Sequence, residues 1–103
     1  MSKFPLQFSA VLHLQPAEYG GELVIYKKIW KHSDEKYRTP YFGYSEKVVH
    51  DIESIKIKPE AGDIVIINPI HYHAISKIKG KHDRISIGFF FAPTDEQRLA
   101  CWA

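Results

Sequence analysis

The sequence has one cysteine, Cys101, among 103 residues, so neither an intrachain disulfide nor a cysteine-based metal cluster is expected. It has no apolar run near the roughly 20 residues that a membrane-spanning helix needs, and its first residues lack the apolar stretch of a signal peptide. The net charge of +2 is too small and too dispersed to indicate nucleic-acid or polybasic membrane contacts. These absences predict a protein of the reducing cytoplasm with neither nucleic-acid nor membrane partners.

Short β-like segments separated by glycine and proline turns make up most of the chain. A hydrophobic content of 45% and a length of 103 residues fit one globular domain. The expected strands cover residues 7–15, 22–29, 48–58, 64–68, 72–78 and 84–91. The β-branched run 64–68 is expected to be fully buried. Short strands with Gly/Pro turns, and no βαβ alternation, favour an all-β sandwich or jelly roll.

Two segments interrupt this pattern. Residues 30–47 read as a long polar and aromatic loop, with a helical turn near 33–36. Its aromatic residues either cover the open side of a small sheet or wall a substrate pocket, in which case Arg38 and Lys36 are candidate contacts for a charged substrate. Near the end of the chain, residues 94–97 (Thr-Asp-Glu-Gln) have capping-box form and predict a short C-terminal helix.

His71 and His73 are two residues apart, so on a regular strand they share one face. Imidazole is a ligand for iron, zinc or copper. Either histidine is therefore a candidate metal ligand, and the alternative is a hydrogen-bonded wall residue.

Arg84 opens the last apolar strand, and Ser86 lies on the same face two residues later. A guanidinium grips a carboxylate in bidentate fashion, and the hydroxyl adds a second hydrogen bond. The alternative is an edge arginine paired with Asp63 or Asp83. If this strand pairs with the strand of His73, the imidazole and the guanidinium face one cavity.

The other histidines give weaker signals. His13 faces away from the apolar stripe of the first strand, so it either lines a cavity or lies on the surface. His32 and Asp34 have the H-x-D form of a metal-ligand pair, but a solvated polar loop is the favoured interpretation. His50 and His82 lie among charges and are expected to face solvent.

The ordered motifs resemble one family. Residues 20–23 read Gly-Gly-Glu-Leu, residues 59–66 read Pro-x-x-Gly-Asp-Ile-Val-Ile, residues 73–75 read His-Ala-Ile, and residues 84–87 read Arg-Ile-Ser-Ile. Together they resemble the C-terminal part of the iron(II)/2-oxoglutarate-dependent oxygenases. Residues 29–38 and 43–49 resemble the subgroup that includes free-amino-acid halogenases and hydroxylases.

The resemblance implies a cupin-like double-stranded β-helix, Fe(II) and 2-oxoglutarate as cofactors, and a small-molecule substrate such as an amino acid. His73 resembles the distal iron ligand. Arg84 resembles the arginine that binds the distal carboxylate of 2-oxoglutarate, and Ser86 matches the serine of the R-x-S pattern. The Gly-Gly-Glu-Leu turn has a structural role in this comparison.

One departure from the family concerns the proximal iron motif, His-x-Asp or His-x-Gly/Ala, which precedes the strand leading to Gly-Gly-Glu-Leu. Residues 1–12 contain no histidine, His13 lies too late, and His32-x-Asp34 lies on the wrong side of the glycines. The chain therefore resembles the second half of such an enzyme, and this resemblance predicts an incomplete jelly roll. Missing strands leave open edges, so we expect a homo-oligomer that covers an edge.

Three functions follow for residues 1–103 taken as a single domain. The first is an oxygenase domain that hydroxylates or halogenates a small molecule, with turnover in doubt because the proximal motif is absent. The second is a small cupin-like module that binds a carboxylate or a metal without turnover. The third is a structural fragment that folds by self-association.

Overall fold

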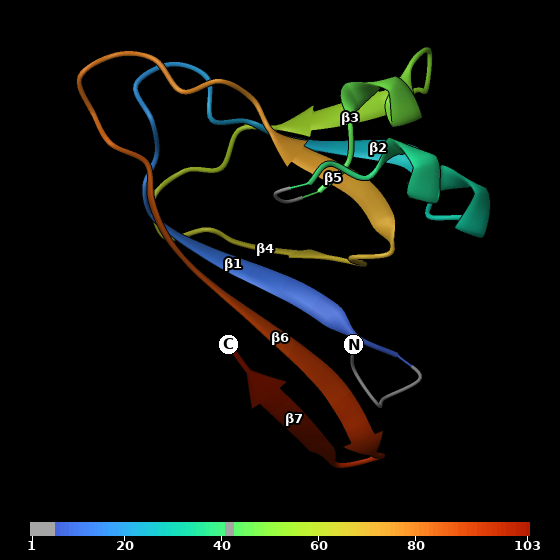
Figure 1. The fold of residues 1–103 in the computed structure, drawn as a ribbon. Helices are drawn as coiled ribbons and strands as arrows, with labels where there is room; N and C mark the ends of the chain where they lie inside the picture. The colour runs from blue at the N-terminus through green and yellow to red at the C-terminus, as the bar shows by residue number, and fades with distance from the viewer. Residues whose placement is uncertain (1–5, 41–42) are drawn as a thin grey trace.

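A computed structural model of the chain describes residues 6–40 and 43–103. Within them, seven strands and two short 3₁₀ helices alternate with turns (Figure 1). The elements are β1 (Phe8–Gln15), β2 (Leu23–Ile29), η1 (His32–Tyr37), η2 (Glu46–Val49), β3 (Ser54–Ile57), β4 (Ile64–Ile67), β5 (His71–Ile75), β6 (Ile85–Asp95) and β7 (Arg98–Trp102). None of the helices described is long and apolar enough to cross a membrane.

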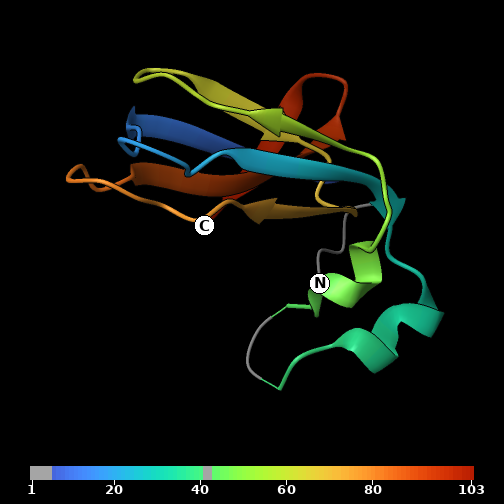
Figure 2. The ribbon, with the colours of Figure 1, turned by 90° about the horizontal axis from the view of Figure 1, so that it is seen from above.

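The strands form two antiparallel sheets. One has the order β4-β1-β6-β7 and the other the order β3-β2-β5. Figure 1 shows the two groups of strands, with η1 and η2 at one end of the three-stranded sheet, and Figure 2 shows the same helical segment from above. This arrangement confirms the predicted all-β, jelly-roll class.

The Gly-Gly turn before β2 depends on the absence of side chains. Gly20 and Gly21 have φ angles of 68° and 67°, which glycine adopts without steric penalty. A Cβ atom on Gly20 would lie 1.8 Å from the carbonyl oxygen of Lys77. The structural role predicted for this turn is consistent with that contact.

The predicted C-terminal helix is wrong. β6 continues through Asp95, and the chain turns back as β7. The Gln97 N–H donates to Asp95 Oδ1 at 2.8 Å, which closes the turn, while Phe90 and Trp102 stack across the two strands. Pairing along β6 and burial of aromatic rings outweigh a capping signal that acts only locally.

Two further strand predictions need correction. Residues 48–58 do not form one strand, because 48 and 49 belong to η2 and Asp51 has a left-handed φ of 59°, so β3 begins only at Ser54. Residues 64–68 are not fully buried, because Ile64 and Ile66 are each 56% exposed. Their side chains point to a face of the sheet that nothing in the described chain covers.

Candidate functional site

His13 occupies a buried position opposite Ser86. The register of β1 and β6 pairs these two residues directly, which places their side chains on one face of the sheet. His13 is 2% exposed, and its Nε2 has no hydrogen-bond partner in the described structure. Buried polar atoms are nearly always paired, so an orphaned ring nitrogen marks a place where a polar ligand would bind.

The backbone fixes the position of this histidine. The His13 N–H donates to the Asp63 carbonyl at 2.9 Å, and the Gly62 N–H donates to the His13 carbonyl at 2.8 Å. Burial lowers the pKa of His13, and the positive charge of Arg84 lowers it further, while Asp63 acts in the opposite direction. A neutral, buried imidazole therefore lies within the field of a guanidinium.

Arg84 is half-buried and lies beside the Gly-Gly turn. A Cβ atom on Gly21 would lie 3.4 Å from Arg84 Cδ, so the glycine leaves room for the alkyl stem. Across the described residues, Arg84 forms no ion pair with Asp63 or Asp83, contrary to the edge-arginine interpretation. One carboxylate placed here would accept hydrogen bonds from the Arg84 guanidinium, the Ser86 hydroxyl and the unpartnered His13 ring.

The sequence of β1 alone allows His13 either to line a cavity or to lie on the surface. The signal that resolves it is cross-strand register, because His13 opposes Ser86 only when β1 and β6 are neighbours. Alternation along β1 predicts the face but not the partner strand.

His71 and His73 both lie on β5, as expected, and both line one cavity. His71 Nδ1 is 3.1 Å from the Tyr26 carbonyl, and His73 Nδ1 is 2.8 Å from the His71 carbonyl. Since a carbonyl only accepts, each Nδ1 carries the proton. In the neutral ring, Nε2 then keeps its lone pair, which is the form that binds a metal.

These two histidines do not complete an iron site. In the part of the chain that the structure describes, no three His, Cys, Asp or Glu side chains are grouped to hold a metal, whereas a facial triad needs two histidines and a carboxylate. His73 lies on β5 of the three-stranded sheet, whereas Arg84 directly precedes β6 of the four-stranded sheet, so their segments do not pair as neighbours. The described residues therefore fit a carboxylate better than they fit iron.

The cavity beside β5 has a volume of about 600 Å³, within the range of small-molecule sites. Aromatic residues contribute much of its wall, together with both histidines of β5. The aromatic side chains concerned are Tyr26, Trp30, Tyr44 and Tyr72. This supports the substrate-pocket interpretation for Trp30 and Tyr44. Tyr41 and Phe42 lie outside the described residues.

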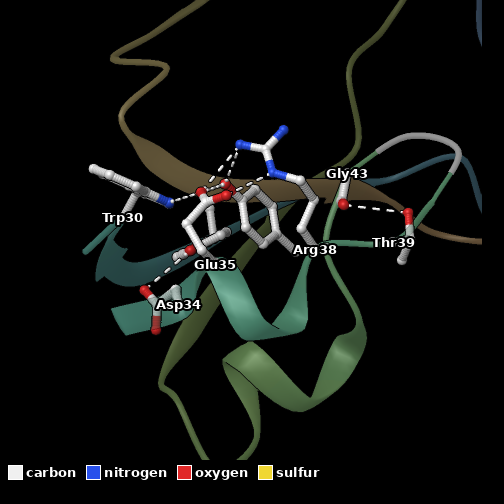
Figure 3. Close-up of polar contacts among 8 residues, drawn as sticks. Trp30, Asp34, Glu35, Arg38, Thr39 and Gly43 are labelled. Atoms are coloured by element: carbon white, nitrogen blue, oxygen red, sulfur yellow. Dashed lines mark hydrogen bonds and ion pairs between the residues drawn. The ribbon is translucent and has the colours of Figure 1, made fainter. Parts of the chain in front are cut away.

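A hydrogen-bond network around Glu35 holds one wall of this cavity in place (Figure 3). Its carboxylate accepts from Trp30 Nε1 at 2.9 Å, from Arg38 Nε at 2.8 Å and from the Tyr44 hydroxyl at 2.8 Å. Arg38 also donates to the Tyr44 hydroxyl at 3.0 Å. Arg38 is thus already committed to an intramolecular carboxylate, which weakens its candidacy as a contact for a charged substrate.

Asp34 anchors the same loop to the sheet beneath it. It is 5% exposed, accepts from the Lys31 N–H at 3.1 Å and the Tyr72 hydroxyl at 3.0 Å, and pairs with Lys28 at 3.3 Å. Burial raises the pKa of Tyr72, and the hydrogen bond to Asp34 raises it further. Its three partners give Asp34 a structural role, and its burial contradicts the solvated loop expected for this residue.

Replacing Glu35 by glutamine is expected to lower the melting temperature at pH 7 and to have progressively less effect in acid. Hydrogen bonds from Arg38, first, and then Tyr44 and Trp30 outweigh burial and lower the pKa of Glu35 from 4.5 to about 2. A carboxylate whose pKa is lower in the folded state stabilises the fold at pH values above its unfolded-state pKa. This contribution to stability is lost as the pH falls towards 2. Thermal unfolding from pH 7 to pH 2.5 measures this.

Glu53→Gln is the matched control, because its carboxylate is 78% exposed and makes only a long ion pair with Lys27 at 3.8 Å. It should have little effect at any pH. A Glu35→Gln deficit that stayed constant from pH 7 to pH 2.5 would contradict the role given to the carboxylate charge.

Comparison with known proteins places these features in context. Residues 2–103 match the family described as carrier-protein-independent halogenase WelO5. The chain is 42% identical over 64 residues to leucinostatins biosynthesis cluster protein S of Purpureocillium lilacinum, covering 58% of this chain and 26% of that protein. It is 27% identical over 84 residues to L-gamma-glutamyl-L-propargylglycine hydroxylase of Streptantibioticus cattleyicolor, covering 82% and 31%.

Two further relatives agree with this pattern. The chain is 25% identical over 93 residues to L-isoleucine 3(1)-dioxygenase of Pantoea ananatis, covering 86% of this chain and 31% of that protein. Its fold is similar to a crystal structure of an N-substituted L-amino acid dioxygenase from Burkholderia ambifaria in complex with alpha-KG, with a TM-score of 0.71 and 19% identity over 97% of this chain and 40% of that one. The chain thus spans about a third of the length of the curated relatives.

Proposed function

Because the chain belongs to the WelO5 family of carrier-protein-independent halogenases, we propose that it is part of an iron(II)/2-oxoglutarate-dependent oxygenase that hydroxylates or halogenates an amino acid or a similar small molecule. The observation that carries this proposal is the buried, unpartnered His13 Nε2 beside Ser86 and Arg84. Residues 1–103 form the domain that holds the cosubstrate.

The distal carboxylate of 2-oxoglutarate is bound by Arg84 and Ser86, with His13 as a third contact. The guanidinium supplies charge and a fork of donors, the hydroxyl donates one hydrogen bond, and His13 donates from Nε2 when the ring carries its proton there. When bound, 2-oxoglutarate would supply two electrons to O₂ by oxidative decarboxylation and would leave as succinate and CO₂. Burial of His13 excludes water from one side of the carboxylate and strengthens each contact.

His73 is the iron ligand that this chain contributes, with its Nε2 presented by the hydrogen bond from Nδ1 to the His71 carbonyl. The described residues do not supply the other iron ligands. We therefore expect no turnover with His73 as the single ligand. The substrate is held in the cavity beside β5, against Trp30 and Tyr44.

Calorimetric titration of the chain with 2-oxoglutarate tests the cosubstrate site. Saturable binding is expected without added metal. His13→Leu should weaken it about tenfold, the equivalent of one hydrogen bond. His13→Gln, whose amide nitrogen reaches the position of Nε2, should retain most of the affinity. Equal affinities for the wild type and the His13→Leu variant would remove His13 from the site.

A second candidate function is a carboxylate-binding module without turnover, favoured by the absence of a three-ligand metal group among the described residues. Addition of iron(II) to the 2-oxoglutarate titration separates the two. An affinity for 2-oxoglutarate that rises with iron(II) in the wild type, and does not rise in His73→Ala, supports the oxygenase part, whereas binding that iron(II) does not change supports the module. If the chain binds neither metal nor 2-oxoglutarate, the remaining function is that of a structural fragment that folds by self-association.

We also propose a cytoplasmic location, from the single cysteine, and self-association, from the open edges of both sheets. β5 pairs only with β2 in its sheet, so the backbone groups along its other edge are free to pair with another strand.

A further inference from the structure

The four-stranded sheet has one face that is apolar except for Gln15, which pairs with Ile85 at one end of it. Register pairs Leu12 with both Ile64 and Ile87, and Ala10 with both Ile66 and Phe89, so these side chains share a face. β7 extends this surface, because Cys101 pairs with Phe91 and Leu99 with Pro93. We call this surface the outer face, consisting of Phe8, Ala10, Leu12, Ile64, Ile66, Ile85, Ile87, Phe89, Phe91, Pro93, Leu99 and Cys101.

The outer face carries no charged residue, and five of its aliphatic side chains are open to solvent. Ile64 and Ile66 are 56% exposed, Ile85 46%, Ile87 51% and Leu99 63%. Single exposed aliphatic residues are ordinary on a protein surface, but a contiguous apolar patch drawn from four strands marks an interaction site. This surface is separate from His13 and Ser86, which lie on the opposite face of the same sheet.

The whole chain exposes more surface than a compact monomer. Its accessible area is 7980 Å², whereas area-to-mass scaling gives roughly 6000 Å² for a protein of this size. Its radius of gyration is 15.1 Å, against about 13 Å for a compact domain of 100 residues. The excess of about 2000 Å² exceeds the roughly 800 Å² that each partner buries in a standard interface.

We propose that the outer face is the contact surface of a dimer of this chain, with a second copy packed sheet against sheet. A twofold dimer brings the same patch together from both partners, and an uncharged, predominantly apolar patch complements itself. Two antiparallel sheets stack at about 10 Å through such faces. A charged partner would gain no ion pair here.

The outer face contributes more to association than the sheet edges do. Edge pairing at β5 replaces hydrogen bonds between backbone groups and water by hydrogen bonds between two strands. The net gain in free energy per hydrogen bond is small. The face removes five half-exposed aliphatic side chains per copy from water, which is the larger driving force. This contact does not depend on 2-oxoglutarate or metal binding.

Sedimentation equilibrium of the 103-residue chain tests the proposal, with Ile66→Lys and Ile87→Lys as the disrupting variants. We expect a wild-type dimer whose dissociation constant rises at least tenfold in each variant, because a lysine buried there has no partner. Ile55→Lys is the matched control, since Ile55 is 60% exposed but lies on β3 of the other sheet. A monomeric wild type, or equal weakening by Ile55→Lys, would overturn the proposal.

The native thiol gives a second readout that needs no disrupting variant. Cys101 is exposed and lies on the outer face. Its reaction rate with a thiol reagent should fall several-fold as wild-type concentration rises through the dimerisation range, and should stay constant for Ile87→Lys. A wild-type rate that does not change with concentration would rule out this face as the contact.

Discussion

Replacing Arg84 by alanine is expected to weaken 2-oxoglutarate binding about 100-fold or more. The guanidinium is half-buried beside the buried His13 and has no ion-pair partner in the described structure, so a bound carboxylate would be its counter-charge. Truncating one side of a buried charge pair commonly costs 2–5 kcal/mol, and each 1.4 kcal/mol is about tenfold in affinity. Calorimetry of the variant at matched pH and salt measures the loss.

Arg84→Lys separates charge from geometry. Lysine keeps the positive charge but lacks the planar fork that holds both carboxylate oxygens, so its affinity should fall between those of the wild type and the alanine variant. Because the Arg84 stem packs beside Gly21, the melting temperatures of both variants have to be compared with the wild type. Folded variants that bind 2-oxoglutarate like the wild type would remove Arg84 from the site.

The elements that could be predicted are those whose signals are local and strong. β1 and β2 begin and end within a residue of the expected bounds, because alternation and the Gly-Gly turn specify both. The helical turn expected near residues 33–36 lies within η1. His71 and His73 share a strand and a cavity because a spacing of two determines a face.

The features that could not be predicted depend on residues distant in sequence. The capping-box letters near residue 94 act over one turn, whereas β7 forms because β6 offers a partner strand. The isoleucines of β4 were expected to be buried because β-branched runs usually are, yet burial depends on what covers the sheet. The Glu35 network joins residues 30 to 44 through side chains, which no periodicity reveals.

Replacing Asp34 by alanine is expected to lower the melting temperature by roughly 10 °C or more. The change leaves the Tyr72 hydroxyl and the Lys31 N–H without their acceptor, and removes the counter-charge of Lys28. Burial favours the neutral acid, but the hydrogen bonds from Lys31, Tyr72 and Lys28 outweigh it and lower the pKa of Asp34. Its stabilising effect is therefore present at neutral pH and is lost in acid.

The partner lysine makes the test specific. Lys28 is 22% exposed at its side chain and also donates to the Val48 carbonyl at 2.8 Å, so it ties η1 and η2 to β2. If the Asp34→Ala variant is destabilised mainly because Lys28 loses its counter-charge, adding Lys28→Met should raise the melting temperature again in part. The double variant no longer contains the unpaired buried charge of Lys28. If the two changes are strictly additive, the ion pair contributes nothing, and the loss belongs to the hydrogen bonds of Tyr72 and Lys31. In either case the wall that carries Tyr72 should loosen, and substrate affinity should fall along with stability.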